Sequence, residues 1–172
     1  MKLFLITGEA RHGKDTTASY IESYLKGYKI SISDSLKKIL GNKLGISIGK
    51  IDYHKNNHVL YKGLDIRSEL RKTAKVFLQL DHHYFVTKVI EKIKQQNNDV
   101  VVIPDLRFKN EYFALKETFD DITIIRIIRE TTNISDVIHL DKEIIGEDYI
   151  IKNNGTLEDL QIKIENIIKE IL

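Results

Sequence analysis

Short runs of apolar residues alternate along the chain with longer stretches in which apolar residues recur every three or four positions. The short runs predict buried β-strands, and the longer stretches predict amphipathic helices. Strands are expected at residues 2–6, 28–33, 99–105, 122–128 and 148–152. Helices are expected at residues 17–26, 36–44, 66–80, 84–96, 109–117 and from Thr156 onwards. This alternation predicts an α/β fold with a parallel sheet covered by helices on both faces.

Three segments stand out against this alternation. The strand at residues 99–105 is so rich in valine and isoleucine that we expect it in the centre of the sheet. Residues 46–64 and residues 129–148 are instead polar and irregular. An excursion as long as residues 46–64 inside a compact domain is usually functional or mobile.

Composition narrows the class of protein. With 172 residues, of which 42% are hydrophobic and 30% charged, we expect one globular domain spanning residues 1–172. A net charge of +2 is too small to indicate a nucleic-acid polymer as partner. The absence of cysteine excludes disulfides and cysteine-ligated zinc. No apolar run approaches the roughly 20 residues of a membrane span, and the first strand leaves no room for a signal peptide. We therefore expect a cytoplasmic protein that does not bind membranes.

A loop with two glycines and a lysine links the first expected strand to the first expected helix. Its sequence is GEARHGKDTT, from Gly8 to Thr17, and it follows the phosphate-loop pattern GxxxxGK[ST] except that Asp15 replaces the first hydroxyl. Backbone amides of such a loop surround phosphate oxygens, and the lysine, here Lys14, reaches the β- and γ-phosphates. Thr16 is then the hydroxyl expected near the phosphates or Mg²⁺. The alternative is a glycine-rich turn with a chance lysine.

Polar residues follow the other strands as well. Ligands of parallel α/β sheets bind beyond the carboxyl ends of the strands. This rule predicts that residues 8–17, residues 33–35, residues 105–107 and Arg129 are neighbours in space. Their convergence at one edge of the sheet is the main functional signal in the sequence.

Asp105 ends its strand as a Walker-B carboxylate does, and it is a candidate for holding Mg²⁺ through water or for orienting an acceptor. Arg107 is a candidate for binding an acceptor phosphate through its guanidinium, with Glu111 holding it in place. The alternative is a helix cap at Asp105 with a surface pair of Arg107 and Glu111.

The remaining cations and histidines complete the inventory. Arg67 and Arg71 lie on the helix that follows the irregular residues 46–64. Arg126 lies within a strand, and for it a structural role is at least as well supported as a role in the site. The histidines do not have the HxxxH or HExxH spacing of a transition-metal site.

With these residues in view, the chain resembles the bacteriophage deoxynucleoside monophosphate kinase family of P-loop kinases. The resemblance rests on GEARHGKDTTA near the start, VVIPDLRFKNE in the middle and DYIIKNNGTLEDL near the end. It covers most of the chain and is poorest over residues 46–64. It implies a three-layer sandwich with a five-stranded parallel sheet in the order 2-3-1-4-5. It also implies an acceptor-binding helical region over about residues 34–98 and a lid over about residues 130–147.

The resemblance further implies γ-phosphoryl transfer from ATP, with Mg²⁺, to a deoxynucleoside 5′-monophosphate. The residues implied as catalytic are Lys14, Arg11, Asp105 and Arg129. Those implied in nucleotide binding are Gly8, Ala10, Arg11, His12, Gly13, Lys14, Asp15, Thr16, Thr17, Arg129 and Asn153. Those implied in acceptor binding are Ser33, Asp34, Lys37, Arg67, Arg71, Asp105, Arg107 and Glu111. Thr16 and Asp105 are the implied Mg²⁺ ligands, directly or through water.

Two other functions fit the same residues. One is a P-loop kinase for another small acceptor, such as phosphomevalonate or dephospho-coenzyme A. The other is a module that binds nucleotide without turnover, although such a module has no need of a cluster like Asp105 and Arg107. The sequence permits a homodimer without requiring one.

Overall fold

The computed structural model describes residues 1–130 and 146–172. Five parallel strands form one sheet in the order β2-β3-β1-β4-β5, which confirms the expected topology. The strands are β1 (Lys2–Gly8), β2 (Tyr28–Lys29), β3 (Val100–Ile103), β4 (Ile122–Ile128) and β5 (Tyr149–Lys152). In the central register, Leu5 lies opposite Ile103 on one side and Ile124 on the other. Nearly all of the expected lid, residues 130–147, lies outside the described residues.

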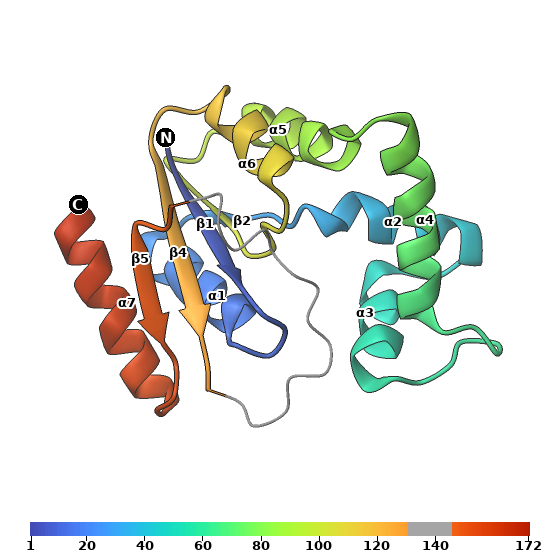
Figure 1. Cartoon of the computed structure of the whole chain (residues 1–172), viewed down its shortest axis with the longest axis horizontal. Coiled ribbons are helices and arrows are strands. Elements are labelled where there is room, and N and C mark those ends of the chain that lie inside the picture. The colour runs from blue at the N-terminus through green and yellow to red at the C-terminus, as the bar shows by residue number, and fades with distance from the viewer. Residues whose placement is uncertain (131–145) are drawn as a thin grey trace.

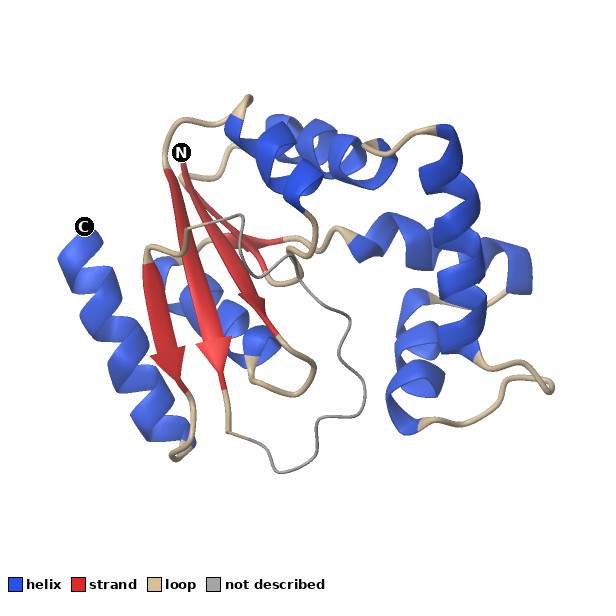
Figure 2. Ribbon diagram, in the orientation of Figure 1, coloured by secondary structure: helices blue, strands red, loops and turns tan. Residues whose placement is uncertain are grey.

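Helices cover both faces of the sheet (Figures 1 and 2). The helices are α1 (Lys14–Leu25), α2 (Ser33–Leu44), α3 (Ile48–Asn57), α4 (Ile66–Leu80), α5 (Tyr84–Gln95), α6 (Lys109–Lys116) and α7 (Leu157–Ile171). Side chains alternate along β1, so Phe4 and Ile6 pack with α1 and α7, whereas Leu3 and Leu5 pack with α5 and α6. The result is the three-layer α/β sandwich that the sequence predicts.

A third apolar cluster lies apart from the sheet. Leu40 of α2, Ile51 of α3, and Ile66 and Leu70 of α4 are buried against one another. Helices α2, α3 and α4 therefore form a helical unit, which lies to the right of the sheet in Figure 1.

The structure corrects the expectation that residues 46–64 are irregular, because α3 occupies Ile48–Asn57. The Ser47 side chain caps this helix by accepting a hydrogen bond from the backbone N–H of Lys50. Ile51 is the one buried residue of α3, so the helix has almost no apolar stripe to recognise in the sequence.

Two other boundaries differ from expectation. The second strand is confined to Tyr28–Lys29 and does not reach residue 33, because the carboxylate of Asp105 binds the backbone N–H groups of Ile32 and Ser33 where α2 begins. The first helix begins at Lys14 rather than at residue 17. Lys14, Asp15 and Thr16 are therefore in its first turn.

The expected helix start at Thr156 is confirmed by a reciprocal cap. Thr156 Oγ1 accepts from the N–H of Asp159, and Asp159 Oδ2 accepts from the N–H of Thr156. Within residues 1–130 and 146–172, the structure has no helix of the length and apolar character that crossing a bilayer requires.

Candidate functional site

The loop between β1 and α1 is sharply curved, as the phosphate-loop pattern predicts. Arg11 and Gly13 have positive φ angles of 66° and 103°, and Gly13 directly precedes the first turn of α1. Gly8, with φ of 140°, lies so close to β4 that a Cβ atom there would collide with the backbone carbonyl of Ile127. The start and end of this loop therefore both require glycine.

The side chain of Lys14 lies inside this curve. Its Nζ donates a hydrogen bond of 2.6 Å to the backbone carbonyl of Glu9. Burial lowers the pKa of the Lys14 ammonium, and the nearby Arg107 guanidinium lowers it further, while Asp15, Asp105 and Glu9 act in the opposite direction. Lys14 and the pair of Asp105 and Arg107 thus belong to one electrostatic environment, although some 90 residues separate them in sequence.

A pocket of about 340 Å³ opens beside the loop. It is lined by Arg11, Gly13, Lys14, Asp15, Thr16, Arg129, Asn153, Thr156, Leu157 and Leu160. One side of the pocket is the loop with its cations, and the other side is the turn from β5 into α7. Ligand pockets typically begin near this size.

Hydrogen bonds connect the two sides of this pocket. Asn153 is buried, and its Nδ2 donates to the carbonyl of His12 at 2.8 Å. Arg129 Nε donates to the carbonyl of Asn153 at 2.7 Å. These bonds hold the phosphate loop against the ends of β4 and β5, so the shape of the pocket depends on all three segments.

Not every residue of the loop faces the pocket. The His12 side chain is buried, with Nδ1 lying 3.2 Å from the carbonyl of Ile127 and 3.3 Å from the backbone nitrogen of Arg129. Thr17 is fully buried on α1. The side chains of His12 and Thr17 therefore pack within the protein and are not among those that line the pocket beside the loop. Ala10 is exposed on the loop.

Asp105 fastens the end of β3 to the start of α2. Its carboxylate accepts hydrogen bonds from Ser31 Oγ at 2.6 Å, from the N–H of Ile32 at 2.8 Å and from the N–H of Ser33 at 3.0 Å. Asp105 is thus a helix cap, as the alternative interpretation held, but it caps α2 rather than the helix that follows it in sequence. The hydroxyl of Ser33 lies 2.8 Å from the hydroxyl of Ser31, which is itself bonded to Asp105.

Glu111 is buried and binds the backbone rather than the guanidinium of Arg107. Its Oε2 accepts hydrogen bonds from the N–H groups of Arg107 and Phe108, at 2.8 and 2.9 Å. Burial raises the pKa of the Glu111 carboxyl to about 7, even though these two hydrogen bonds favour the charged form. Glu111 thereby fixes the chain that carries the exposed Arg107.

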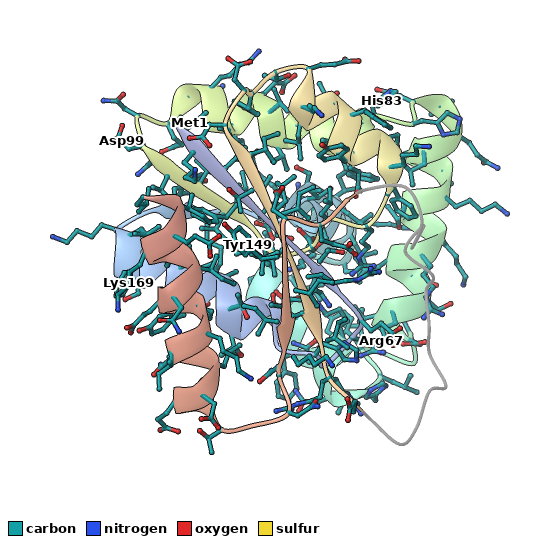
Figure 3. The ribbon with its side chains drawn as sticks, turned by 60° about the vertical axis from the view of Figure 1, so that its left-hand side comes forward. Met1, Arg67, His83, Asp99, Tyr149 and Lys169 are labelled. Carbon is teal, nitrogen blue, oxygen red and sulfur yellow. The ribbon has the colours of Figure 1, made fainter. Side chains whose placement is uncertain are left out.

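The other residues that the sequence predicts on an acceptor side lie on the helical unit. Lys37 of α2 forms ion pairs with Asp34 at 3.5 Å and with Asp52 of α3 at 3.2 Å. Arg67 Nε donates to the backbone carbonyl of Lys55 at 3.0 Å. Figure 3 places Arg67 toward the carboxyl ends of the strands and Met1 and Asp99 at the opposite end of the sheet.

Two further arginines, Arg71 and Arg126, are not among the residues that line the pocket. Arg71 is exposed on the second turn of α4. Arg126 forms an ion pair with Glu147, the structural role that its place within a strand suggested.

The candidate Mg²⁺ ligands fit the ion to different degrees. Mg²⁺ prefers oxygen ligands and keeps several of its waters. Thr16 is exposed and lines the pocket beside Lys14, so its hydroxyl is open to a metal. Both oxygens of Asp105 already accept hydrogen bonds, so it fits as a partner of a metal-bound water. The described residues contain no cluster of three or more histidine or acidic side chains arranged as metal ligands.

The sequence pattern did not identify Asp52 or Leu157 as site residues. Asp52 lies in the segment that was expected to be irregular, and its contact with Lys37 joins two helices. Leu157, in the first turn of α7, is 51% exposed and lines the pocket. Its position directly after the expected helix start was the one available signal.

Comparison with known proteins adds the fold family. No model of a known protein family matches the chain. Protein BCAP of Xenopus laevis is 25% identical over 158 residues, which are 90% of this chain and 22% of that protein. The chain thus spans about a fifth of the length of this relative.

Solved structures cover nearly the whole chain at low identity. A sugar kinase from Janibacter sp. has a TM-score of 0.55 and 11% identity, covering 99% of this chain and 95% of that one. Shikimate kinase from Aquifex aeolicus has a TM-score of 0.51 and 16% identity, with coverages of 99% and 97%. Dephospho-CoA kinase from Campylobacter jejuni has a TM-score of 0.51 and 17% identity, with coverages of 99% and 98%. The chain has the α/β fold of the P-loop kinases.

Proposed function

We propose that this protein transfers the γ-phosphoryl group of ATP to a deoxynucleoside 5′-monophosphate, giving ADP and a deoxynucleoside diphosphate. One observation carries the proposal: the ammonium of Lys14, in the phosphate loop, shares its surroundings with Arg107 and Asp105 from the end of β3. A site for a donor phosphate and a site for an acceptor phosphate then lie side by side. The choice of a deoxynucleotide acceptor rests on the resemblance of the sequence motifs.

On the donor side, the pocket beside the loop is the proposed ATP site. Arg11, Lys14 and Arg129 supply positive charge for the phosphates. The exposed face of Leu157 supplies an apolar surface for the base, and the buried Asn153 holds this side of the pocket in place. Ala10, Gly13 and Asp15 contribute through their position in the loop.

Mg²⁺ would be held by the ATP phosphates, by the hydroxyl of Thr16 and, through water, by Asp105. When bound, it neutralises negative charge on the β- and γ-phosphates. The chain's own residues position both substrates and balance their charge, because phosphoryl transfer needs little else from a protein.

On the acceptor side, Arg107 is the proposed partner of the acceptor phosphate, and Glu111 fixes its backbone. An oxygen of the acceptor phosphate attacks the γ-phosphorus, and the bond to the β,γ-bridging oxygen breaks to release ADP. Ser33, Asp34, Lys37, Arg67 and Arg71 are proposed to border the rest of the acceptor.

The test is an acceptor panel in which ADP release is measured with ATP and Mg²⁺. The panel contains dAMP, dCMP, dGMP, dTMP, phosphomevalonate and dephospho-coenzyme A. We expect one or more deoxynucleotides to accelerate ADP formation. If only another acceptor does so, the substrate assignment is wrong, and if ADP binds without any turnover, the protein is a binding module.

A pair of lysine variants tests the mechanism in the same assay. Lys14→Met should reduce turnover at least about 100-fold, because it removes a charge that stabilises the transferring group. Lys169→Met removes an exposed lysine near the end of α7 and should leave turnover unchanged (Figure 3). Circular dichroism checks that both variants are folded, and full activity of Lys14→Met would contradict the phosphate-loop mechanism.

A further inference from the structure

The ammonium of Lys37 forms ion pairs with carboxylates from two helices, α2 and α3. Asp52 Oδ2 lies 3.2 Å from Lys37 Nζ, and Asp34 Oδ1 lies 3.5 Å from it. Asp105 is close enough to add to the electrostatic attraction. The Lys37 side chain is only 12% exposed, so its head group is confined by these neighbours.

Asp52 is the carboxylate that joins α3 to this cluster. Its Oδ2 accepts a hydrogen bond from Lys37, and its Oδ1 accepts one from Lys55 at 2.9 Å. The neighbouring Ile51 is fully buried between α2 and α4, which sets the rotation of α3 and turns Asp52 toward α2. Arg67 binds the carbonyl of Lys55, so α4 is tied to the same turn of α3.

The charges of this cluster support one another. Burial alone would lower the pKa of the Lys37 ammonium, but Asp52 and Asp34 outweigh it, and the pKa is raised. Burial would raise the pKa of the Asp52 carboxyl, but Lys55 and Lys37 outweigh it, and the pKa is lowered. Lys37 and Asp52 therefore form a pair of charged groups over the neutral pH range.

The contribution of this pair to stability is expected to be small. The side chains of Asp34 and Asp52 are 35% and 32% exposed, and ion pairs that reach solvent are worth at most about 1 kcal/mol. Exposure on this side also means that a bound molecule can reach the cluster. A role in positioning therefore explains the arrangement better than a role in folding.

We propose that Asp52 is a positioning residue for phosphoryl transfer, which holds the ammonium of Lys37 between α2 and α3 on the acceptor side of the site. This inference rests on the proposed function. Without Asp52, the near partner of Lys37 is Asp34, three residues earlier on the same helix. The ammonium is then no longer held between α2 and α3, and the acceptor loses a fixed positive charge.

Nuclear magnetic resonance of ¹³C-labelled lysine tests the contact without any substrate. Lys37→Arg identifies the Lys37 signal, which is then titrated in the wild type, in Asp52→Asn and in Asp52→Glu. The pKa of Lys37 should be lower in Asp52→Asn than in the wild type and should recover in Asp52→Glu. An unchanged titration in Asp52→Asn would overturn the inference.

Kinetics test the role, with the deoxynucleotide of the panel that gives the highest rate as acceptor. Asp52→Asn should raise the KM for the acceptor about tenfold and leave the KM for ATP unchanged. It should also move the alkaline limb of the pH profile to lower pH, whereas Asp52→Glu should restore much of the acceptor KM. A merely structural residue would change neither the pH profile nor the acceptor KM selectively.

A double-mutant cycle shows whether Asp52 acts through Lys37. Asp52→Asn should have little further effect in the Lys37→Met background. Glu91→Gln breaks an exposed ion pair with Lys88 on α5 and serves as the matched control, with unchanged kinetics. Additive effects in the cycle would overturn the inference.

The two proposals fail in different ways. If the wild type transfers phosphate to no acceptor in the panel, the proposed function fails, and the inference fails with it. If the wild type is active and Asp52→Asn keeps the wild-type acceptor KM and pH profile, the inference alone fails.

Discussion

Glu111 shows how a single side chain at this site responds to pH. Its carboxyl is buried beneath Arg107 and Phe108, and burial raises its pKa to about 7 from an ordinary value of 4.5. Between these two pH values the folded protein keeps the proton, whereas the unfolded chain has lost it. The free energy of unfolding therefore falls as the pH rises from about 4.5 to about 7, and this contribution is constant above that range.

Glu111→Gln should remove this dependence and still accept both backbone hydrogen bonds through its carbonyl oxygen. Urea unfolding at pH 5, 6, 7 and 8 measures the difference. The free energy of unfolding of the variant minus that of the wild type should increase by about 1–3 kcal/mol as the pH rises from 5 to 8. Glu117→Gln, an exposed residue at the end of α6, controls for the loss of one negative charge. A constant difference between Glu111→Gln and the wild type would refute the prediction.

Among the elements, α3 is the one whose stability depends most on a single contact. Ile51 is its one buried residue and is packed with Leu40, Ile66 and Leu70. The helical unit of α2, α3 and α4 has this cluster as its own core, and Leu36 of α2 also packs against the cluster that the sheet shares with α5 and α6. Loss of packing at Ile51 should therefore loosen the helical unit more than the sheet.

Ile51→Ala should lower the free energy of unfolding by about 2–4 kcal/mol through loss of buried apolar surface and creation of a cavity. Hydrogen exchange measured by mass spectrometry should increase in α3 and α4, while β1 and β4 remain protected. Val76→Ala, at a position of α4 that is 56% exposed, is the matched control. Equal loss of protection in sheet and helical unit would show that the two unfold together.

In the whole molecule, the proposed donor site belongs to the sheet with α1 and α7. The proposed acceptor site combines Arg107, after β3, with residues of the helical unit. Asp105 connects them, because it follows β3 closely in the chain and caps α2. The geometry of the proposed phosphoryl transfer then depends on a hydrogen-bonded junction between the sheet and the helical unit.

ADP binding provides a measure of the donor site in the intact protein. At a concentration of 100 times its Kd, ADP should stabilise the fold by about 2.7 kcal/mol. For a chain of this size, such a gain corresponds to a rise in Tm of about 5–10 °C. Thermal unfolding with and without ADP and Mg²⁺ measures the shift, which should shrink on addition of EDTA and be lost in Lys14→Met. If millimolar ADP leaves the Tm of the wild type unchanged, the pocket is not the ADP site that we propose.

Much of this fold could be read from local pattern. The apolar runs marked all five strands, and the alternation with helices indicated a parallel sheet. The loop from Gly8 to Thr17 was recognisable because its glycines and lysine have a fixed spacing between strand and helix. The common edge of the sheet also predicted that Asp105 and Arg107 lie near Lys14, as they do.

Other features arise from contacts between segments far apart in the chain. Helix α3 is held by one buried residue and a cap, so its sequence carries almost no periodic signal. The early end of β2 reflects the competition of the Asp105 carboxylate for the backbone of Ile32 and Ser33. Neither outcome is visible in a window of neighbouring residues.

Spacing along the chain was therefore enough to reveal the sheet and the phosphate loop, because strand burial and loop curvature depend on adjacent residues. The tertiary structure decides which side chains face the site, because their orientation depends on packing and hydrogen bonds between distant segments. The inward turn of His12, the exposure of Leu157 and the pairing of Asp52 with Lys37 all belong to this second group.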